Sequence, residues 1–186
     1  MSRFEKLFQK FGIKPRNLPI YEEAFIHTSY AYEHRLAYNY EKLEFLGDAV
    51  ISLVVGEHLY RSHLDMATPG QLSKARIIMV QSKTLIKAAR ELGLDKLVLL
   101  GGAVQKSKNI SEKIYEDVFE AFVGAVYLDQ GINVVRTVLK RTIIHYYEIH
   151  SLNAFQDFKS LLQEYMQKFS KYDITYKTVI SQKDDY

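Results

Sequence analysis

The sequence has 186 residues, of which 47% are hydrophobic, with a net charge of +3 and no cysteine. This hydrophobic fraction is normal for a globular protein, and the length suffices for one fair-sized domain or one domain with a small appendage. Disulfides and thiolate metal sites are excluded. No apolar run could cross a bilayer and the chain has no signal-peptide start, so we expect no membrane partner and a cytoplasmic location.

Two short helices are predicted at the N-terminal end. Residues 2–11 carry apolar side chains on one helical face and stop at Gly12, a residue that often follows a helix. A turn marked by Pro15 and Pro19 precedes a second helix that contains His27. A single histidine beside apolar residues is more often a hydrogen-bonded structural residue than a metal ligand or general base, so we expect a structural role.

A long, largely apolar helix is predicted over residues 40–60, and it carries three carboxylates. At about 100° per residue, Glu41, Glu44 and Asp48 fall within an arc of about 60°. Burying unpaired carboxylates is costly, so the site needs cations nearby, yet no Lys or Arg shares this arc. Phe45, Ile51 and Val55 flank the arc, and the opposite side holds Leu43, Leu46, Val50, Leu53 and Val54.

The middle of the chain predicts two further helices. Thr68–Gly70 opens the first, and Ser82 is expected to cap the second, which ends at Gly93. The apolar run 97–100 is too isolated to predict a sheet.

Four basic residues in this region are candidate phosphate contacts. Lys74 and Arg76 lie on the first of these helices, and Lys106 and Lys108 lie in the polar loop 105–111. The alternative is that they are ordinary solvent-exposed charges, which is common for basic residues on helices.

A second apolar helix with acidic residues is predicted over residues 111–128. Asp117 and Glu120 stand three residues apart on one face, with Gly124 one turn further along the same stripe. Glycine destabilises a helix interior by up to about 1 kcal/mol relative to alanine. We therefore expect Gly124 to provide clearance beside a ligand or another backbone.

The pattern changes after residue 150. A linker at 151–153 is followed by a predicted helix over 155–169 and by an alternating, strand-like stretch over 174–180. We therefore divide the chain into a domain of residues 1–150 and a C-terminal segment of residues 151–186.

The two acidic helices, if they face each other, form one oxygen-rich pocket. Oxygen-only ligands favour Mg²⁺ or Mn²⁺, and such a cluster can hold two ions about 3.5 to 4 Å apart, as suits displacement at phosphorus. The alternative is that these acids are ordinary surface residues. Because five acids lie on two apolar helices, this alternative is the weaker interpretation. The pocket would collect Glu41, Glu44, Asp48, Asp117 and Glu120.

A ferritin-like di-iron bundle would also use helical carboxylates. It requires Glu-x-x-His pairs, but Gly47 stands three residues after Glu44 and Val123 three after Glu120. This class is therefore excluded.

Three stretches resemble the ribonuclease III family. Asn39–Val50 is similar, without gaps, to the family signature N-x-E-R-L-E-F-L-G-D-A/S-V. Asp117–Asp129 resembles the second acidic helix of the family, and Ala24–Tyr30 resembles its A-L-T-H-x-S-Y element.

The resemblance implies roles for the acidic residues. Glu44, Asp48, Asp117 and Glu120 would be the ligands of divalent ions, Mg²⁺ or its substitute Mn²⁺, with Asp48 and Glu120 central to catalysis. Glu41 would help to organise the site or contact the substrate. The family usually has an acidic residue where this chain has Pro69, so an auxiliary acidic contact at that point is not expected.

The resemblance also implies a fold and an activity. The fold would be all-α, a ribonuclease III endonuclease domain, followed by a partial α+β segment that resembles the start of a double-stranded-RNA-binding domain. The activity would be Mg²⁺-dependent cleavage of double-stranded RNA, leaving 5′ phosphates and short 3′ overhangs. Such staggered cuts need a homodimer, in which Phe45 would enter a socket on the partner.

Two rival hypotheses remain within this resemblance. The chain could be a catalytically inactive relative that acts as a structural or regulatory RNA-binding protein, although such a relative should have lost acids from the pocket. It could also be a nuclease domain that needs another chain for RNA binding.

Overall fold

The computed structural model describes residues 3–62, 68–107 and 109–154. Most of these residues are helical, and the one strand-like pairing among them is an isolated parallel bridge between Ile26 and Leu99. The prediction of an all-α fold is therefore confirmed for this part of the chain. The predicted helix over 155–169 and strand over 174–180 lie outside the described residues.

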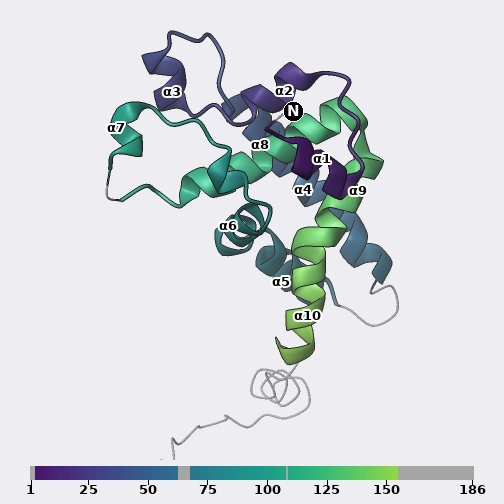
Figure 1. Cartoon of the computed structure of the whole chain (residues 1–186). Coiled ribbons are helices and arrows are strands. Elements are labelled where there is room, and N and C mark those ends of the chain that lie inside the picture. The colour runs from purple at the N-terminus through teal and green to yellow at the C-terminus, as the bar shows by residue number, and fades with distance from the viewer. Residues whose placement is uncertain (1–2, 63–67, 108, 155–186) are drawn as a thin grey trace, which may run out of the picture. The chain divides into compact units, whose positions relative to one another are not determined.

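The helices follow one another through short connections (Figure 1). The chain divides into two compact units, Met1–Glu148 and Ile149–Tyr186, and the site lies in the first. The predicted linker at 151–153 is part of the last helix. The elements are α1 (Glu5–Phe11), α2 (Leu18–Glu23), α3 (Thr28–Glu33), α4 (Glu41–Ser62), α5 (Pro69–Val80), α6 (Ser82–Glu91), the 3₁₀ turn η1 (Leu94–Lys96), α7 (Gly102–Gln105), α8 (Lys113–Gln130), α9 (Ile132–Leu139), the π-helical turn η2 (Lys140–Ile144) and α10 (His145–Ala154).

Helices α4 and α8 form the centre of the first unit. Helix α4 packs against α8 and α5, and α8 also packs against α6 and α9. Along α8 an unbroken run from Val118 to Val126 is buried, which explains why this helix is apolar nearly all round. Other helices therefore cover α8 on most of its sides.

Two glycines let α4 and α8 cross at short range. A Cβ atom at Gly47 would overlap the backbone carbonyl of Glu120, and a Cβ atom at Gly124 would overlap that of Leu43. The clearance predicted at Gly124 therefore serves another backbone, which brings the acidic faces of the two helices together.

Aromatic side chains attach the N-terminal helices to this pair. Phe4 stacks on Phe25 with ring centroids 5.1 Å apart, and Phe8 meets the ring of Tyr21 edge-on at 4.9 Å. Tyr21 and Phe25 both reach Phe122 of α8. As predicted, the first helix ends at Gly12, whose φ of 67° is left-handed.

Candidate metal centre

Three carboxylates converge where α4 and α8 cross. One oxygen atom from each of Glu44, Asp117 and Glu120 lies within 4.8 Å of the others. Asp117 and Glu120 keep only 8% and 7% of their surface exposed, and Glu44 is half-buried. A buried group of this kind, built from oxygen atoms alone, suits a hard divalent cation.

The start of α4 positions the first of these acids. The side chain of Asn39 accepts a hydrogen bond from the backbone N–H of Glu41 at 2.9 Å, which fixes the first turn. The next residue, Tyr40, is buried, and its hydroxyl donates to Asp117 Oδ2 at 3.2 Å. Tyr40 thus links α4 to the acidic face of α8, a contact that helical periodicity alone could not predict.

Burial and mutual repulsion make this cluster hard to ionise. Burial, followed by the charges of Asp48, Glu116 and Glu44, raises the pKa of Glu120 to about 8. Burial, followed by the charge of Asp117, also raises the pKa of Glu44. The cluster therefore holds less negative charge at neutral pH than its carboxylates could carry, unless a cation compensates for them.

Lys113 supplies the cation that the sequence analysis did not find. Its Nζ atom donates to Asp117 Oδ1 at 2.7 Å and lies 4.0 Å from Glu116 Oε2. The hydrogen bond to Asp117, opposed by burial and aided by nearby carboxylates, raises the pKa of Lys113. The spacing of Lys113 and Asp117, four residues apart on a helix, is the sequence signal that could have identified this pair.

The other two predicted acids lie at the rim of the cluster. Asp48 is exposed and stands outside the group of three, although its charge acts on Glu120. Glu41 is exposed as well, and its Oε2 atom accepts a hydrogen bond from Asn39 at 3.2 Å. The structure therefore places three of the five acids together and leaves these two where a substrate or solvent can reach them.

A further acid, Glu116, borders the cluster without having been predicted. It accepts a hydrogen bond from the hydroxyl of Ser82 at 2.6 Å. The prediction that Ser82 caps α6 is wrong, because Gln81 is the N-cap residue and Ser82 is the first helical residue. The serine side chain instead connects α6 to α8.

Comparisons with known proteins assign this chain to a family. A family profile described as Ribonuclease-III-like matches residues 17–147. The chain belongs to the ribonuclease III family. The matched segment contains the cluster and both helices that build it.

Several relatives in this family are ribonuclease 3 proteins of bacteria. The chain is 39% identical to that of Ureaplasma parvum serovar 3 over 190 aligned positions, which cover 98% of this chain and 80% of the relative. It is 36% identical to that of Staphylococcus aureus, covering 96% of this chain and 74% of the relative. It is 48% identical to that of Mycoplasmoides gallisepticum, covering 86% of this chain but only 24% of that longer relative.

Solved structures of the family share the fold. The nuclease domain of ribonuclease III from Campylobacter jejuni matches with a TM-score of 0.69 at 35% identity, covering 77% of this chain and 95% of that domain. A second structure of that domain, at 34% identity and TM-score 0.69, covers 76% of this chain and 96% of that domain, and is described as flexible in a region involved in dimer formation. Dicer from Pichia stipitis matches at 0.55 and 27% identity, covering 76% of this chain and 60% of Dicer.

His27, part of the family-like stretch 24–30, has structural contacts. Its Nδ1 atom accepts a hydrogen bond from the backbone N–H of Ser29 at 3.1 Å and so caps α3. Its ring lies edge-on to Tyr40 with centroids 5.7 Å apart. Burial lowers the pKa of His27 despite the charges of Asp117 and Glu41, which agrees with the predicted structural role.

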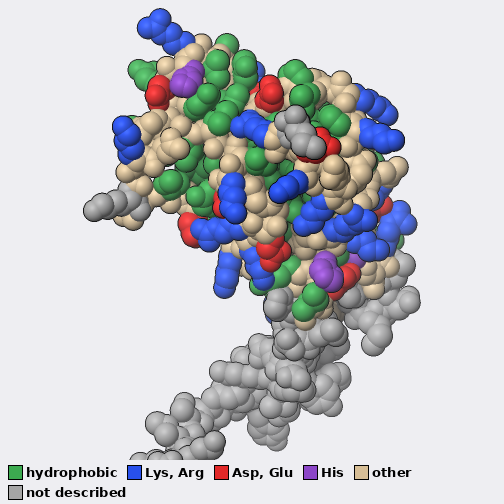
Figure 2. Space-filling view, viewed as in Figure 1, with side chains coloured by type: hydrophobic (Ala, Val, Ile, Leu, Met, Phe, Trp, Pro, Cys, Tyr) green, Lys and Arg blue, Asp and Glu red, His purple; other side chains and the backbone are tan. Residues whose placement is uncertain are grey.

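The basic residues predicted to contact RNA are spread over two elements. Lys74 and Arg76 are exposed on α5, and Lys106 is exposed just after α7. Lys108 lies outside the described residues. On the face shown in Figure 2, Lys and Arg side chains gather over α6 and α9.

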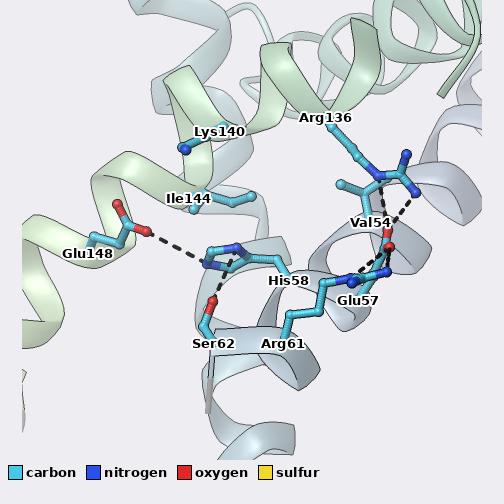
Figure 3. Close-up of a pocket in the computed structure, with 9 residues that line it drawn as sticks. All are labelled: Val54, Glu57, His58, Arg61, Ser62, Arg136, Lys140, Ile144 and Glu148. Carbon is cyan, nitrogen blue, oxygen red and sulfur yellow. Dashed lines mark hydrogen bonds and ion pairs between the residues drawn. The ribbon is translucent and has the colours of Figure 1, made fainter. Parts of the chain in front are cut away.

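A separate groove of about 720 Å³ runs between the C-terminal half of α4 and the segment α9–η2–α10 (Figure 3). At one side of the groove, Glu57 accepts hydrogen bonds from Arg61 at 3.1 Å and from Arg136 at 3.0 and 2.8 Å (Figure 3). The groove contains none of the clustered carboxylates. These ion pairs connect α4 to α9, which gives them a structural role. We therefore assign the groove no role in catalysis.

One face of α4 is apolar and exposed beside the acidic arc. Phe45, Leu53 and Tyr60 are 82%, 63% and 67% exposed. At about 100° per residue they lie within an arc of about 80°, and Phe45 is the member of this arc nearest the carboxylates. The side of α4 opposite the carboxylates, to which the sequence assigns Leu53, is therefore exposed at this residue.

Proposed function

We propose that the chain is an endoribonuclease that cleaves double-stranded RNA with Mg²⁺, or with Mn²⁺ in its place. The observation that carries this proposal is the convergence of Glu44, Asp117 and Glu120 within 4.8 Å at the crossing of α4 and α8. Family membership supports the reaction class, since similar proteins of this family are ribonuclease 3 proteins, and the oxygen-only donor set supports the ion.

The residues of the cluster divide into three roles. Glu44, Asp117 and Glu120 hold the divalent ions, and exposed Asp48 completes their ligands from the rim. Glu41 contacts the substrate or orients its neighbours. A divalent ion held by these residues would supply an activated water and stabilise the charge that develops on the leaving 3′ oxygen. The protein contributes a buried carboxylate frame, held in place by the hydroxyl of Tyr40.

The proposal includes a homodimer formed through the exposed apolar face of α4. Phe45, Leu53 and Tyr60 form an exposed apolar stripe along α4, which a second copy of the chain would cover. This stripe borders the acidic arc, so dimerisation would place two acidic clusters on one assembly. Two offset sites account for a staggered cut with 5′ phosphates and short 3′ overhangs. Dimer formation by the similar Campylobacter jejuni domain supports this assembly.

Phosphate contacts outside the cluster would come from exposed basic residues. Lys74, Arg76 and Lys106 are exposed in the structure, and Lys108 completes the proposed set. Contacts of this kind carry no sequence information and weaken as salt rises. Binding should therefore depend on the shape and charge of the duplex more than on its sequence.

A catalytically inactive RNA-binding relative is the less favoured alternative. Such a protein has no need to keep buried carboxylates together, because their mutual repulsion destabilises the fold unless a cation compensates. The retention of the cluster supports the enzyme.

The direct experiment is to incubate the purified chain with a long RNA duplex and with the matching single strand. We expect Mg²⁺-dependent cutting of the duplex into fragments with 5′ phosphates, abolished by a chelator. An intact duplex across a range of Mg²⁺ concentrations would reject the proposal in favour of the inactive relative.

A further inference from the structure

Lys113 places a positive charge directly on a carboxylate of the candidate metal centre. Its Nζ atom lies 2.7 Å from Asp117 Oδ1. The other oxygen of the same carboxylate accepts the hydroxyl of Tyr40 at 3.2 Å. Both oxygen atoms of Asp117 are thus engaged by the protein itself, and a divalent ion must share or replace one of these contacts.

The position of Lys113 in its helix is unfavourable without the cluster. Lys113 is the first residue of α8, where the helix dipole is positive and a cation is disfavoured. Its side chain is largely exposed, so burial of its stem does not account for its place. The carboxylates of Asp117 and Glu116, which it faces at 2.7 and 4.0 Å, offset this unfavourable position.

The charge of Lys113 also acts on the rest of the cluster. Glu44 and Glu120 both lie within its electrostatic reach, and the positive charge of Lys113 opposes the rise in the pKa of each. A charge that stabilises carboxylates in this way repels a divalent ion approaching the same oxygen atoms. The ammonium group and the ion therefore compete for one site.

We propose that Lys113 is a built-in counter-ion of the metal centre, which stabilises the ion-free protein and lowers its affinity for divalent ions. When an ion binds, the ammonium group leaves Asp117 Oδ1, and its long flexible side chain lets it swing into solvent. The site therefore needs a higher concentration of divalent ion to fill than it would need if the carboxylates had no lysine beside them. This inference rests on the metal centre of the proposed function.

The test compares three variants by calorimetric titration with Mn²⁺ and by thermal unfolding in a chelator. Lys113→Met keeps the length of the side chain and removes its charge. Lys113→Arg keeps the charge. Lys140→Met removes an equal charge from the separate groove in Figure 3, where Lys140 has no ion pair within the described residues.

We expect Lys113→Met to bind Mn²⁺ more tightly by on the order of tenfold, because a neighbouring positive charge is gone. The same variant should unfold at a lower temperature in the chelator, because its carboxylates have lost their counter-ion. Lys113→Arg and Lys140→Met should remain close to the wild type in both measurements. The opposite signs of the two effects distinguish a counter-ion from a residue that merely supports the fold.

Two results would overturn the inference. One is unchanged or weaker Mn²⁺ binding by Lys113→Met, which would mean that the lysine does not compete with the ion. The other is a Lys113→Met protein as stable in the chelator as Lys140→Met. A wild-type protein that binds no divalent ion would instead reject the metal centre itself, and the unfolding comparison would still report on the ion pair.

Discussion

At the scale of single residues, the burial of Glu120 decides when the cluster can bind a cation. Its pKa is raised from 4.5 to about 8 by burial and by the charges of Asp48, Glu116 and Glu44. At neutral pH this carboxyl group is largely protonated in the ion-free protein. Binding of a divalent ion must therefore displace a proton.

This requirement predicts a pH-dependent affinity for metal. Between pH 6.5 and 8.5 the affinity for Mn²⁺ should rise and then level off above about pH 8, where Glu120 is already ionised. Calorimetry in buffers of different ionisation enthalpy should show proton release that is largest near pH 7 and clearly smaller at pH 8.5. The Glu120→Gln variant has lost both the proton and a proposed ligand charge, so it should bind Mn²⁺ more weakly and with a smaller dependence on pH. An affinity that stays flat over this range would contradict the account.

The same shift predicts how the ion-free protein responds to pH. A carboxyl group with a raised pKa stabilises the fold while it is protonated. Its contribution is complete below the unfolded pKa near 4.5 and is lost as the pH rises through about 8. Chemical unfolding in a chelator should therefore show stability falling from pH 6 to 8.5, and the slope should be smaller for Glu120→Gln. If stability fell with the same slope in both proteins, Glu120 would not be the cause of the pH dependence.

Sequence reasoning identified all the clustered acids but not the groups that hold them. Glu44, Asp117 and Glu120 were predictable because carboxylates at helical spacing interrupt apolar helices. The contacts of Tyr40 and Ser82 were not predicted, because a hydroxyl group that donates a hydrogen bond to another helix leaves no periodic pattern in the sequence. Lys113 was not predicted because it lies on the second acidic helix, outside the arc of the first acidic helix where a cation was expected.

At the scale of elements, the close crossing of α4 and α8 assembles the site. Gly47 and Gly124 each face a backbone carbonyl of the other helix, with no room for a methyl group. Gly56, on the same helix as Gly47, has nothing within 4 Å of its Cβ position. Gly56 is therefore a suitable control for substitutions at Gly47 and Gly124.

Alanine should destabilise the protein at Gly47 and Gly124 but not at Gly56. Gly47→Ala and Gly124→Ala must push the helices apart, which should lower the free energy of unfolding by roughly 2 to 4 kcal/mol and weaken metal binding. Gly56→Ala should leave the free energy of unfolding unchanged or raise it by up to about 1 kcal/mol, because alanine favours a helix. Urea unfolding of the three variants measures the difference. Equal stabilities for Gly47→Ala and Gly56→Ala would show that the crossing tolerates a wider spacing.

Most helices could be predicted from periodicity, caps and glycine stops, whereas their exposed faces could not. Leu53 illustrates the limit, since a leucine on an apolar helix is assigned to the core by pattern alone. Only the packing of neighbouring helices reveals that this side of α4 is uncovered. The clearance needed at Gly124 was predictable, but whether it served a ligand or a backbone depended on the tertiary structure.

At the scale of the whole molecule, the uncovered face of α4 predicts self-association. Phe45→Ala removes the most exposed side chain of the stripe, so it should shift the protein toward monomer by about tenfold or more in dissociation constant. Sedimentation velocity over a concentration series measures this shift. Tyr32→Ala, which removes an aromatic ring that is 90% exposed on α3, is the control and should not change the assembly. A wild-type protein that sediments as a monomer at all concentrations would reject the dimer.

The central claim is that the clustered carboxylates hold the metal used for RNA cleavage. The most direct test is the single-turnover cutting rate of an RNA duplex in Mg²⁺ for Glu120→Gln, Asp48→Asn and Glu116→Gln. The first two should lose more than about a hundredfold in rate while still binding the duplex, because each removes a proposed ligand charge. Glu116→Gln, which alters a neighbouring acid outside the group of three, should stay within a few-fold of the wild type. Wild-type cutting by Glu120→Gln would contradict the account.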